Sequence, residues 1–174
     1  MKARSARILN ILLSCIVIMV IIMQYTGHPL KTPTTPSGIL TLEFANTAAK
    51  VQSIVDAWQP VNNRGRSNIA QARLNTYWDF VFILFYSSLL YYWNRYYSRT
   101  TIKYRFIGKV VGLITILAGI LDIVENLGMF KSLSGNISTS NSQLTSVCAT
   151  IKFCLLAISI LTLVWQRVRI GTTR

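Results

Sequence analysis

The sequence predicts an all-α fold: a four-helix transmembrane bundle with an amphipathic surface helix in the first outward-facing loop. Of its 174 residues, 52% are hydrophobic and 13% are charged, a balance typical of a small polytopic membrane protein. Four apolar segments approach the roughly 20 residues that cross a bilayer core of roughly 30 Å. We therefore expect residues 1–174 to form a single membrane domain, whose spans cover about 8–25, 77–94, 107–130 and 144–166.

The net charge of +13 raises the question of a nucleic-acid partner. The basic residues cluster just outside the apolar runs, however, which is the pattern of membrane topology signals. The composition therefore predicts the lipid bilayer as the partner, and no nucleic acid.

The first span is an apolar run from Ile8 to Met23 that follows three basic residues, Lys2, Arg4 and Arg7. A cleaved signal peptide is the alternative. The run is long for the apolar region of a signal peptide, and no small-x-small cleavage site follows in residues 24–28. We expect an uncleaved span.

Residues 28–38 (HPLKTPTTPSG) predict an extended linker, because prolines and glycine oppose a helix. Residues 39–58 then predict one amphipathic helix, too polar to span, that lies on the membrane surface with Trp58 at the headgroup level. The alternative is a small packed hairpin in an extramembrane loop. The apolar residues of the predicted helix recur at helical spacing: Phe44, Ala48, Val51, Val55 and Trp58.

The remaining segments alternate between polar loops and spans. Residues 59–75 predict a polar loop, 94–105 a short basic loop and 131–143 a loop rich in Ser, Asn and Gly. Aromatic residues mark both ends of the second span, as interfacial belts do. They are Trp78 at its entry and Tyr91, Tyr92 and Trp93 at its exit.

The basic residues also predict the orientation. Eleven would lie on the side of the two termini: Lys2, Arg4, Arg7, Arg95, Arg99, Lys103, Arg105, Lys109, Arg167, Arg169 and Arg174. Six would lie on the other side: Lys31, Lys50, Arg64, Arg66, Arg73 and Lys131. The positive-inside rule then places both termini in the cytoplasm of a multi-pass protein of the cell (inner or plasma) membrane.

Each span carries a stripe at the 4–3 spacing that lines the seam of a helical bundle. The third span gives Gly108, Gly112, Thr115, Gly119, Asp122 and Asn126. The fourth gives Thr145, Cys148, Lys152, Leu155, Ser159, Thr162 and Gln166. The second gives Asp79, Ile83, Tyr86, Leu90 and Trp93, and the first gives Asn10, Ser14, Val17, Ile21 and Gln24.

Charged residues inside these spans predict a site. The chain has only five acids, and three of them lie in or at the edge of apolar runs, where each charge costs about 2.5–3.5 kcal/mol to insert. Antiparallel spans would bring these acids and one lysine to similar depth in the outer half of the membrane. The predicted ligand-binding residues are Glu43, Asp79, Tyr86, Asp122, Glu125, Asn126 and Lys152, with Asp122 and Glu125 as principal ligands.

Such a site suits a small cation, an amine or a lipid-like ligand. One alternative is an intramembrane enzyme on a lipid-like substrate, in which Asp122 and Glu125 divide acid and base roles. Another is an accessory or scaffold subunit, in which Lys152 only neutralises the acids and Asn126 joins helices. The sequence assigns no catalytic residue, metal or cofactor, and it leaves open a homo-oligomer or a membrane-complex partner.

Four short motifs resemble an uncharacterised family of small bacterial four-span integral membrane proteins. They are residues 38–45 (GILTLEFA), 78–83 (WDFVFI) with Tyr86, 120–126 (ILDIVEN) and 148–153 (CATIKF). The resemblance implies the four-span architecture and brings no activity with it.

Overall fold

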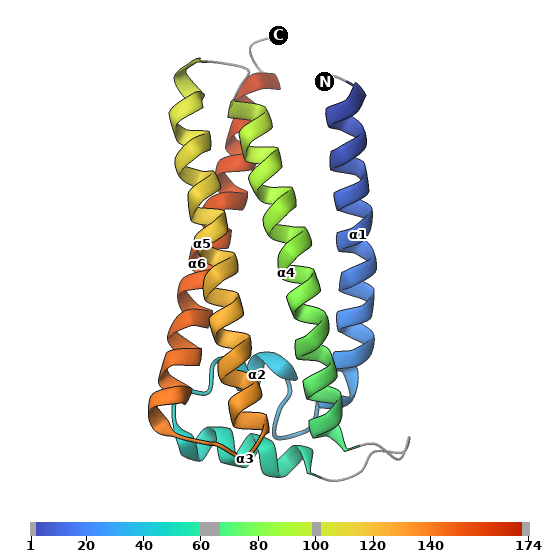
Figure 1. Ribbon diagram of the computed structural model, residues 1–174, viewed down its shortest axis with the longest axis vertical. Coiled ribbons are helices and arrows are strands. Elements are labelled where there is room, and N and C mark those ends of the chain that lie inside the picture. The colour runs from blue at the N-terminus through green and yellow to red at the C-terminus, as the bar shows by residue number, and fades with distance from the viewer. Residues whose placement is uncertain (1–2, 60–66, 99–101, 172–174) are drawn as a thin grey trace.

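A computed structural model describes residues 3–59, 67–98 and 102–171, and every regular element in these ranges is a helix (Figure 1). Four long helices run side by side: α1 (Ala3–Gly27), α4 (Asn68–Ser98), α5 (Ile102–Leu133) and α6 (Thr139–Gly171). The 3-10 helix η1 (His28–Leu30) and the helices α2 (Ile39–Glu43) and α3 (Ala48–Trp58) lie at one end. The start of α1 and the end of α6 lie at the other end. The all-α prediction is confirmed.

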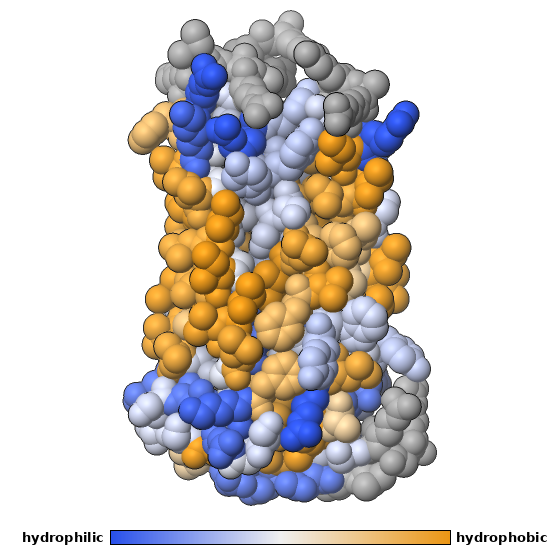
Figure 2. Space-filling view, viewed as in Figure 1, coloured by the Kyte–Doolittle hydropathy of each residue, from blue (hydrophilic) through white to orange (hydrophobic). Residues whose placement is uncertain are grey.

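Three of the long helices can cross a membrane by length and composition. These segments are Ser5–Leu30, Arg105–Leu133 and Thr139–Arg169. The helix α4 is similarly long but is the least apolar of the four. Figure 2 shows hydrophobic side chains around the middle of the bundle and hydrophilic ones at its two ends. This distribution is consistent with a membrane protein.

All four long helices extend beyond the predicted spans. The prediction of a loop over residues 59–75 is wrong for residues 68–75, which form the first two turns of α4. Ser67 starts this helix because its hydroxyl accepts a hydrogen bond from the Ala70 amide at 3.2 Å. The helix α5 continues to Leu133, which shortens the next predicted loop.

Five of the basic residues that predict the orientation lie outside the described residues: Lys2, Arg64, Arg66, Arg99 and Arg174.

The single helix predicted for residues 39–58 is in fact two helices. They divide at residues 44–47, where Thr47 has an extended backbone and its side chain caps α3 by accepting a hydrogen bond from the Lys50 amide. The apolar face of α3 packs into the protein. Trp58, expected at the headgroup level, is fully buried and donates from Nε1 to the Leu30 carbonyl at 3.1 Å. This packing favours the packed alternative over a helix that lies on the membrane surface.

The helices α4, α5 and α6 pack against one another, and α1 packs on the outside of this group against α4. The helix α4 packs on α1 and on α5, and α5 packs on α6, while α4 and α6 also touch. Among the described residues, α1 and α6 do not pack closely on one another. The first and last helices are therefore separated over part of their length, while Ile16 of α1 and Leu156 of α6 pack against the same hydrophobic cluster.

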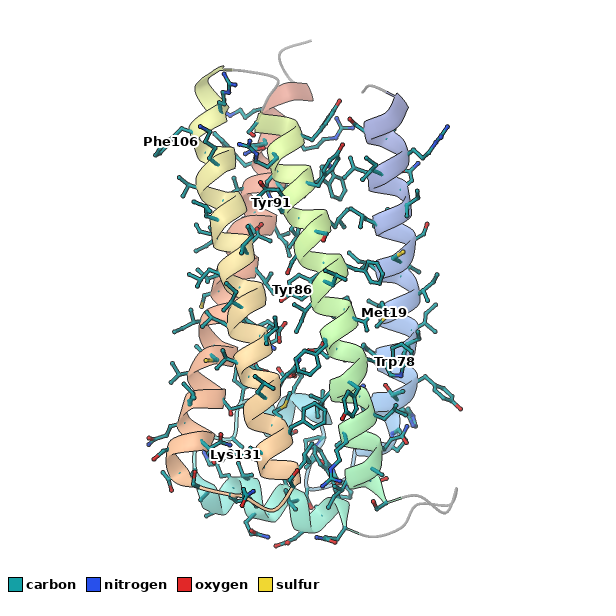
Figure 3. All side chains as sticks on the ribbon, in the orientation of Figure 1. Met19, Trp78, Tyr86, Tyr91, Phe106 and Lys131 are labelled. Carbon is teal, nitrogen blue, oxygen red and sulfur yellow. The ribbon has the colours of Figure 1, made fainter. Side chains whose placement is uncertain are left out.

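The predicted seams are confirmed on three helices and wrong on one. Every predicted seam residue of α5 is buried, and those of α4 and α6 are buried or partly buried. All five predicted seam residues of α1 are exposed instead. The helix α1 uses Leu9, Met19 and Thr26, and Met19 lies between α1 and α4 (Figure 3). Because α1 packs on a single long helix, large apolar side chains suffice for its narrow contact.

Glycines allow the close approach of α5 to its neighbour α4. A Cβ atom on Gly108 would overlap the Ser98 side chain, and a Cβ atom on Gly119 would lie 2.7 Å from the Ser87 hydroxyl. Small residues at such positions let membrane helices pack backbone against backbone.

Candidate functional site

Lys152 on α6 is the centre of a buried carboxylate cluster. Its Nζ atom lies 2.6 Å from Asp122 Oδ1, 2.9 Å from Glu125 Oε1 and 3.4 Å from Glu43 Oε2. All four residues are at least nine-tenths buried. We call Glu43, Asp122, Glu125 and Lys152 the charged layer. Lys152 thus pairs with both acids of α5 and with a third acid from α2.

The acids of the charged layer come from two parts of the chain: two from neighbouring turns of α5 and one from α2. Asp122 and Glu125 lie one turn apart on α5, so both can face α6. Glu43 is the last residue of α2 and reaches the layer through the loop after η1. That loop turns at Gly38, whose φ of 61° lies in the left-handed region that favours glycine.

Hydrogen bonds between α4 and α5 hold two acids of the site, Asp122 and Asp79. The Tyr86 hydroxyl donates to Asp122 Oδ2 at 2.7 Å, and Tyr86 lies midway along α4 (Figure 3). Asn126 Nδ2 donates to Asp79 Oδ2 at 2.7 Å. Asp122 thereby accepts from Lys152 and Tyr86 at once. These contacts connect α4, α5 and α6 at one depth.

The charges of this layer do not balance. One ammonium faces three carboxylates, a formal charge of −2 when all are ionised. Taking such charges out of water costs several kcal/mol per ion unless they are paired. Glu43 is the least well paired, because Oε2 is buried and accepts no hydrogen bond from any residue that the structure describes. Burial raises the pKa of Glu43 above its usual range, against the opposing effect of the Lys152 ammonium.

The charged layer borders a cavity of about 450 Å³, within the range of pockets that bind small molecules. Its polar end is lined by Glu43, Asp79, Asp122 and Lys152. Farther along, its walls are apolar side chains of α4 and α6: Phe82, Leu90, Phe153, Leu156 and Ile160. The polar groups therefore converge at one end of an otherwise apolar space.

The predicted site residues divide into two groups around this cavity. Five line it directly: Glu43, Asp79, Tyr86, Asp122 and Lys152. Glu125 and Asn126 are fully buried and do not line it, so they hold Lys152 and Asp79 in place. This arrangement favours Asp122 over Glu125 as the acid that meets a ligand.

Sequence reasoning missed other lining residues. Asn75 lines the cavity, and its Nδ2 donates to Thr26 Oγ1 at 2.7 Å and to the Met23 carbonyl at 2.9 Å. The i, i+4 polar stripe Gln71, Asn75 and Asp79 could have revealed it, had the helix been extended back to Ser67. Lys31 lines the cavity from a loop, where no periodicity exists to predict it.

A second group of buried polar residues lies farther along α4, α5 and α6, on the side away from α2. The Ser159 hydroxyl accepts a hydrogen bond from Asn94 Nδ2 at 3.1 Å and shares one with the Thr115 hydroxyl at 2.8 Å. All three residues are fully buried, and none lines the 450 Å³ cavity. We call Asn94, Thr115 and Ser159 the neutral layer.

Metal binding and known relatives give no further assignment. Within residues 3–59, 67–98 and 102–171, no group of three or more His, Cys, Asp and Glu side chains is arranged to hold a metal ion. Comparisons with protein-family models, curated proteins and solved structures find no match to this chain. The case for a function therefore depends on the geometry of the site.

Proposed function

We propose that the chain is a four-span protein of a cell (inner or plasma) membrane with both termini in the cytoplasm. The distribution of basic residues supports this orientation. The helix α4 is proposed as the fourth span because it has the length of its neighbours and runs between α1 and α5 (Figure 1). The segment that holds α2 and α3 then faces outward. The motif resemblance to small bacterial four-span proteins implies the same architecture and stays a prediction.

Its function, in this proposal, is to bind the positively charged group of a ligand in the outward-facing cavity. The observation that carries the proposal is the excess of carboxylates over ammonium groups beside a cavity, in an otherwise apolar bundle. Intramembrane ionisable residues mark ligand or ion sites by default. A bound ammonium group would offset part of the net negative charge of the layer and would donate hydrogen bonds to the carboxylates that line the cavity, Asp122 and Glu43.

A titration of the detergent-purified protein with butylammonium tests this function. Thermal unfolding should shift upward with butylammonium but not with butanol or butyrate, by about 2.7 kcal/mol in unfolding free energy at a hundredfold excess over Kd. The shift should shrink in Asp122→Asn. It should persist in the matched control Asp56→Asn, because Asp56 is an exposed acid of α3 whose carboxylate accepts a hydrogen bond from Gln52.

Two results would count against the proposal. Equal shifts with butylammonium and butanol would show that charge is not recognised. A protein that ignores butylammonium, and whose Asp122→Asn variant only loses folding yield or sheds a partner subunit, would be a scaffold.

A further inference from the structure

The cavity is elongated along the bundle, away from the charged layer. On α6 its lining runs from Lys152 to Ile160, eight residues or roughly 12 Å of helix. On α4 it runs from Asn75 to Leu90. A small inorganic cation would use only the polar end. The apolar length of the cavity calls for an apolar group attached to the charged one.

The space between α1 and α6 leads into this cavity. Lining residues come from α1 and α6, the two helices that do not pack closely on one another among the described residues. Several of them are exposed, including Gln24 on α1 and both Phe153 and Ile160 on α6. In a bilayer, this opening would face the acyl chains of lipids. A membrane lipid could therefore enter sideways without leaving the apolar phase.

Both kinds of charge that an ethanolamine-type head group requires are present in the lining of the cavity. Glu43 is nine-tenths buried and lines the cavity, and among the described residues a single ion pair, to Lys152 at 3.4 Å, holds its carboxylate oxygens. A primary ammonium has three donors and matches such an oxygen, whereas a quaternary ammonium has none. Lys31 is exposed and also lines the cavity, from the loop between η1 and α2, so it offers a cation to a neighbouring phosphate.

We propose that the cavity takes one membrane phospholipid with a primary-amine head group. The ammonium lies at Glu43, Asp79 and Asp122, the phosphate lies toward Lys31, and one acyl chain lies along the opening between α1 and α6. This inference rests on the proposed binding of a positively charged group and adds the class of ligand. Charge complementarity selects this head group over phosphatidylglycerol, and hydrogen bonding selects it over phosphatidylcholine.

Native mass spectrometry of the protein from nanodiscs tests the ligand class. The nanodiscs contain equal amounts of phosphatidylethanolamine, phosphatidylcholine and phosphatidylglycerol. The retained lipid should be phosphatidylethanolamine, about tenfold enriched over phosphatidylcholine, the factor expected from one charge-assisted hydrogen bond. Equal retention of the three lipids, retention of none, or enrichment of phosphatidylglycerol would overturn the inference.

A pair of tryptophan variants on α6 tests the path of the acyl chain. Ile160→Trp places a large ring in the cavity wall at a half-exposed position, and it should abolish the enrichment. Leu161→Trp, one residue on, is 68% exposed and does not line the cavity, so it should keep the enrichment. Loss in neither variant, or in both, would overturn the proposed path.

Butylammonium separates this inference from the proposal on which it rests. The upward shift of unfolding with butylammonium should persist in Leu161→Trp, and a cooperative unfolding transition without ligand shows that Ile160→Trp is folded. If butylammonium shifts the wild-type protein and no lipid is enriched, the ammonium site stands and the lipid assignment is wrong. If butylammonium has no effect either, both are wrong.

Discussion

The charged layer and the neutral layer both contain residues of α5 and α6, and they lie two helical turns apart on these helices. Ser159 follows Lys152 by seven residues on α6, and Thr115 precedes Asp122 by seven on α5, roughly 10.5 Å along each axis. Both layers are buried and both connect helices by side-chain hydrogen bonds. They differ in charge and in their surroundings.

The neutral layer carries no charge, whereas the charges of the charged layer do not balance. Ser159 contacts both Asn94 and Thr115, and the layer carries no charge. The charged layer has two carboxylates more than ammonium groups and borders the cavity. Polar residues on a membrane seam are thus not a site in themselves, since they also serve packing. An unbalanced charge beside a cavity is what distinguishes the charged layer.

Removal of Lys152 should have the largest effect on stability. Lys152→Met leaves three buried carboxylates without their cation, and breaking a buried ion pair in this way costs about 3–5 kcal/mol. Thermal unfolding in detergent, followed by tryptophan fluorescence, measures the loss. Adding Asp122→Asn and Glu125→Gln to the variant should restore part of it, because neutral amides remove the uncompensated charge. If Lys152→Met lowers the free energy of unfolding no more than Ser159→Ala does, the charged layer does not differ from the neutral layer in its contribution to stability.

The meeting of α5 and α6 in this layer was predictable from sequence. The seam of α5 includes Asp122 and that of α6 includes Lys152, and counting residues from the ends of each span places them at equal depth. Helical periodicity supplies the face, and the span supplies the depth. Those two quantities bring Lys152 near Asp122 and Glu125 but do not say which acid it pairs with, and the structure shows that it pairs with both.

Other parts of the site depend on contacts that periodicity does not encode. Glu43 reaches Lys152 only because the loop turns at Gly38. The burial of Trp58 depends on a carbonyl 28 residues earlier, at Leu30. The exposed polar stripe of α1 shows a related limit. Periodicity identifies a distinct face of a helix, but it does not say how many neighbours the helix has, so it could not predict the opening between α1 and α6.

The pH dependence of the ligand-free protein should test Glu43 by itself, with a smaller effect than loss of Lys152. Burial raises the pKa of Glu43 in the folded state above the ordinary value of 4.5. The folded state then binds this proton more tightly than the unfolded state does. Its contribution to stability is fully present below about pH 4.5 and is lost as the pH rises through the folded pKa.

Comparison with Glu43→Gln isolates that contribution. The charged groups around Glu43 are Lys152 on α6, Asp122 and Glu125 on α5 and Asp79 on α4, and all remain in the variant. Thermal midpoints from pH 4.5 to 8 should fall more steeply in the wild-type protein than in the variant. Parallel curves would mean that Glu43 does not hold a proton in the folded state.

The smallest effect is expected within the neutral layer. Ser159→Ala removes a hydroxyl that bonds to Thr115, while Asn94 Nδ2 still donates to the Leu90 carbonyl at 2.9 Å. Side-chain hydrogen bonds between membrane helices contribute about 0.6 kcal/mol on average. A double-mutant cycle of Ser159→Ala and Thr115→Val should give a coupling of that size, with the butylammonium response unchanged. A coupling of several kcal/mol, or a lost butylammonium response, would show that the two layers act as one unit and that charge alone does not set the site apart.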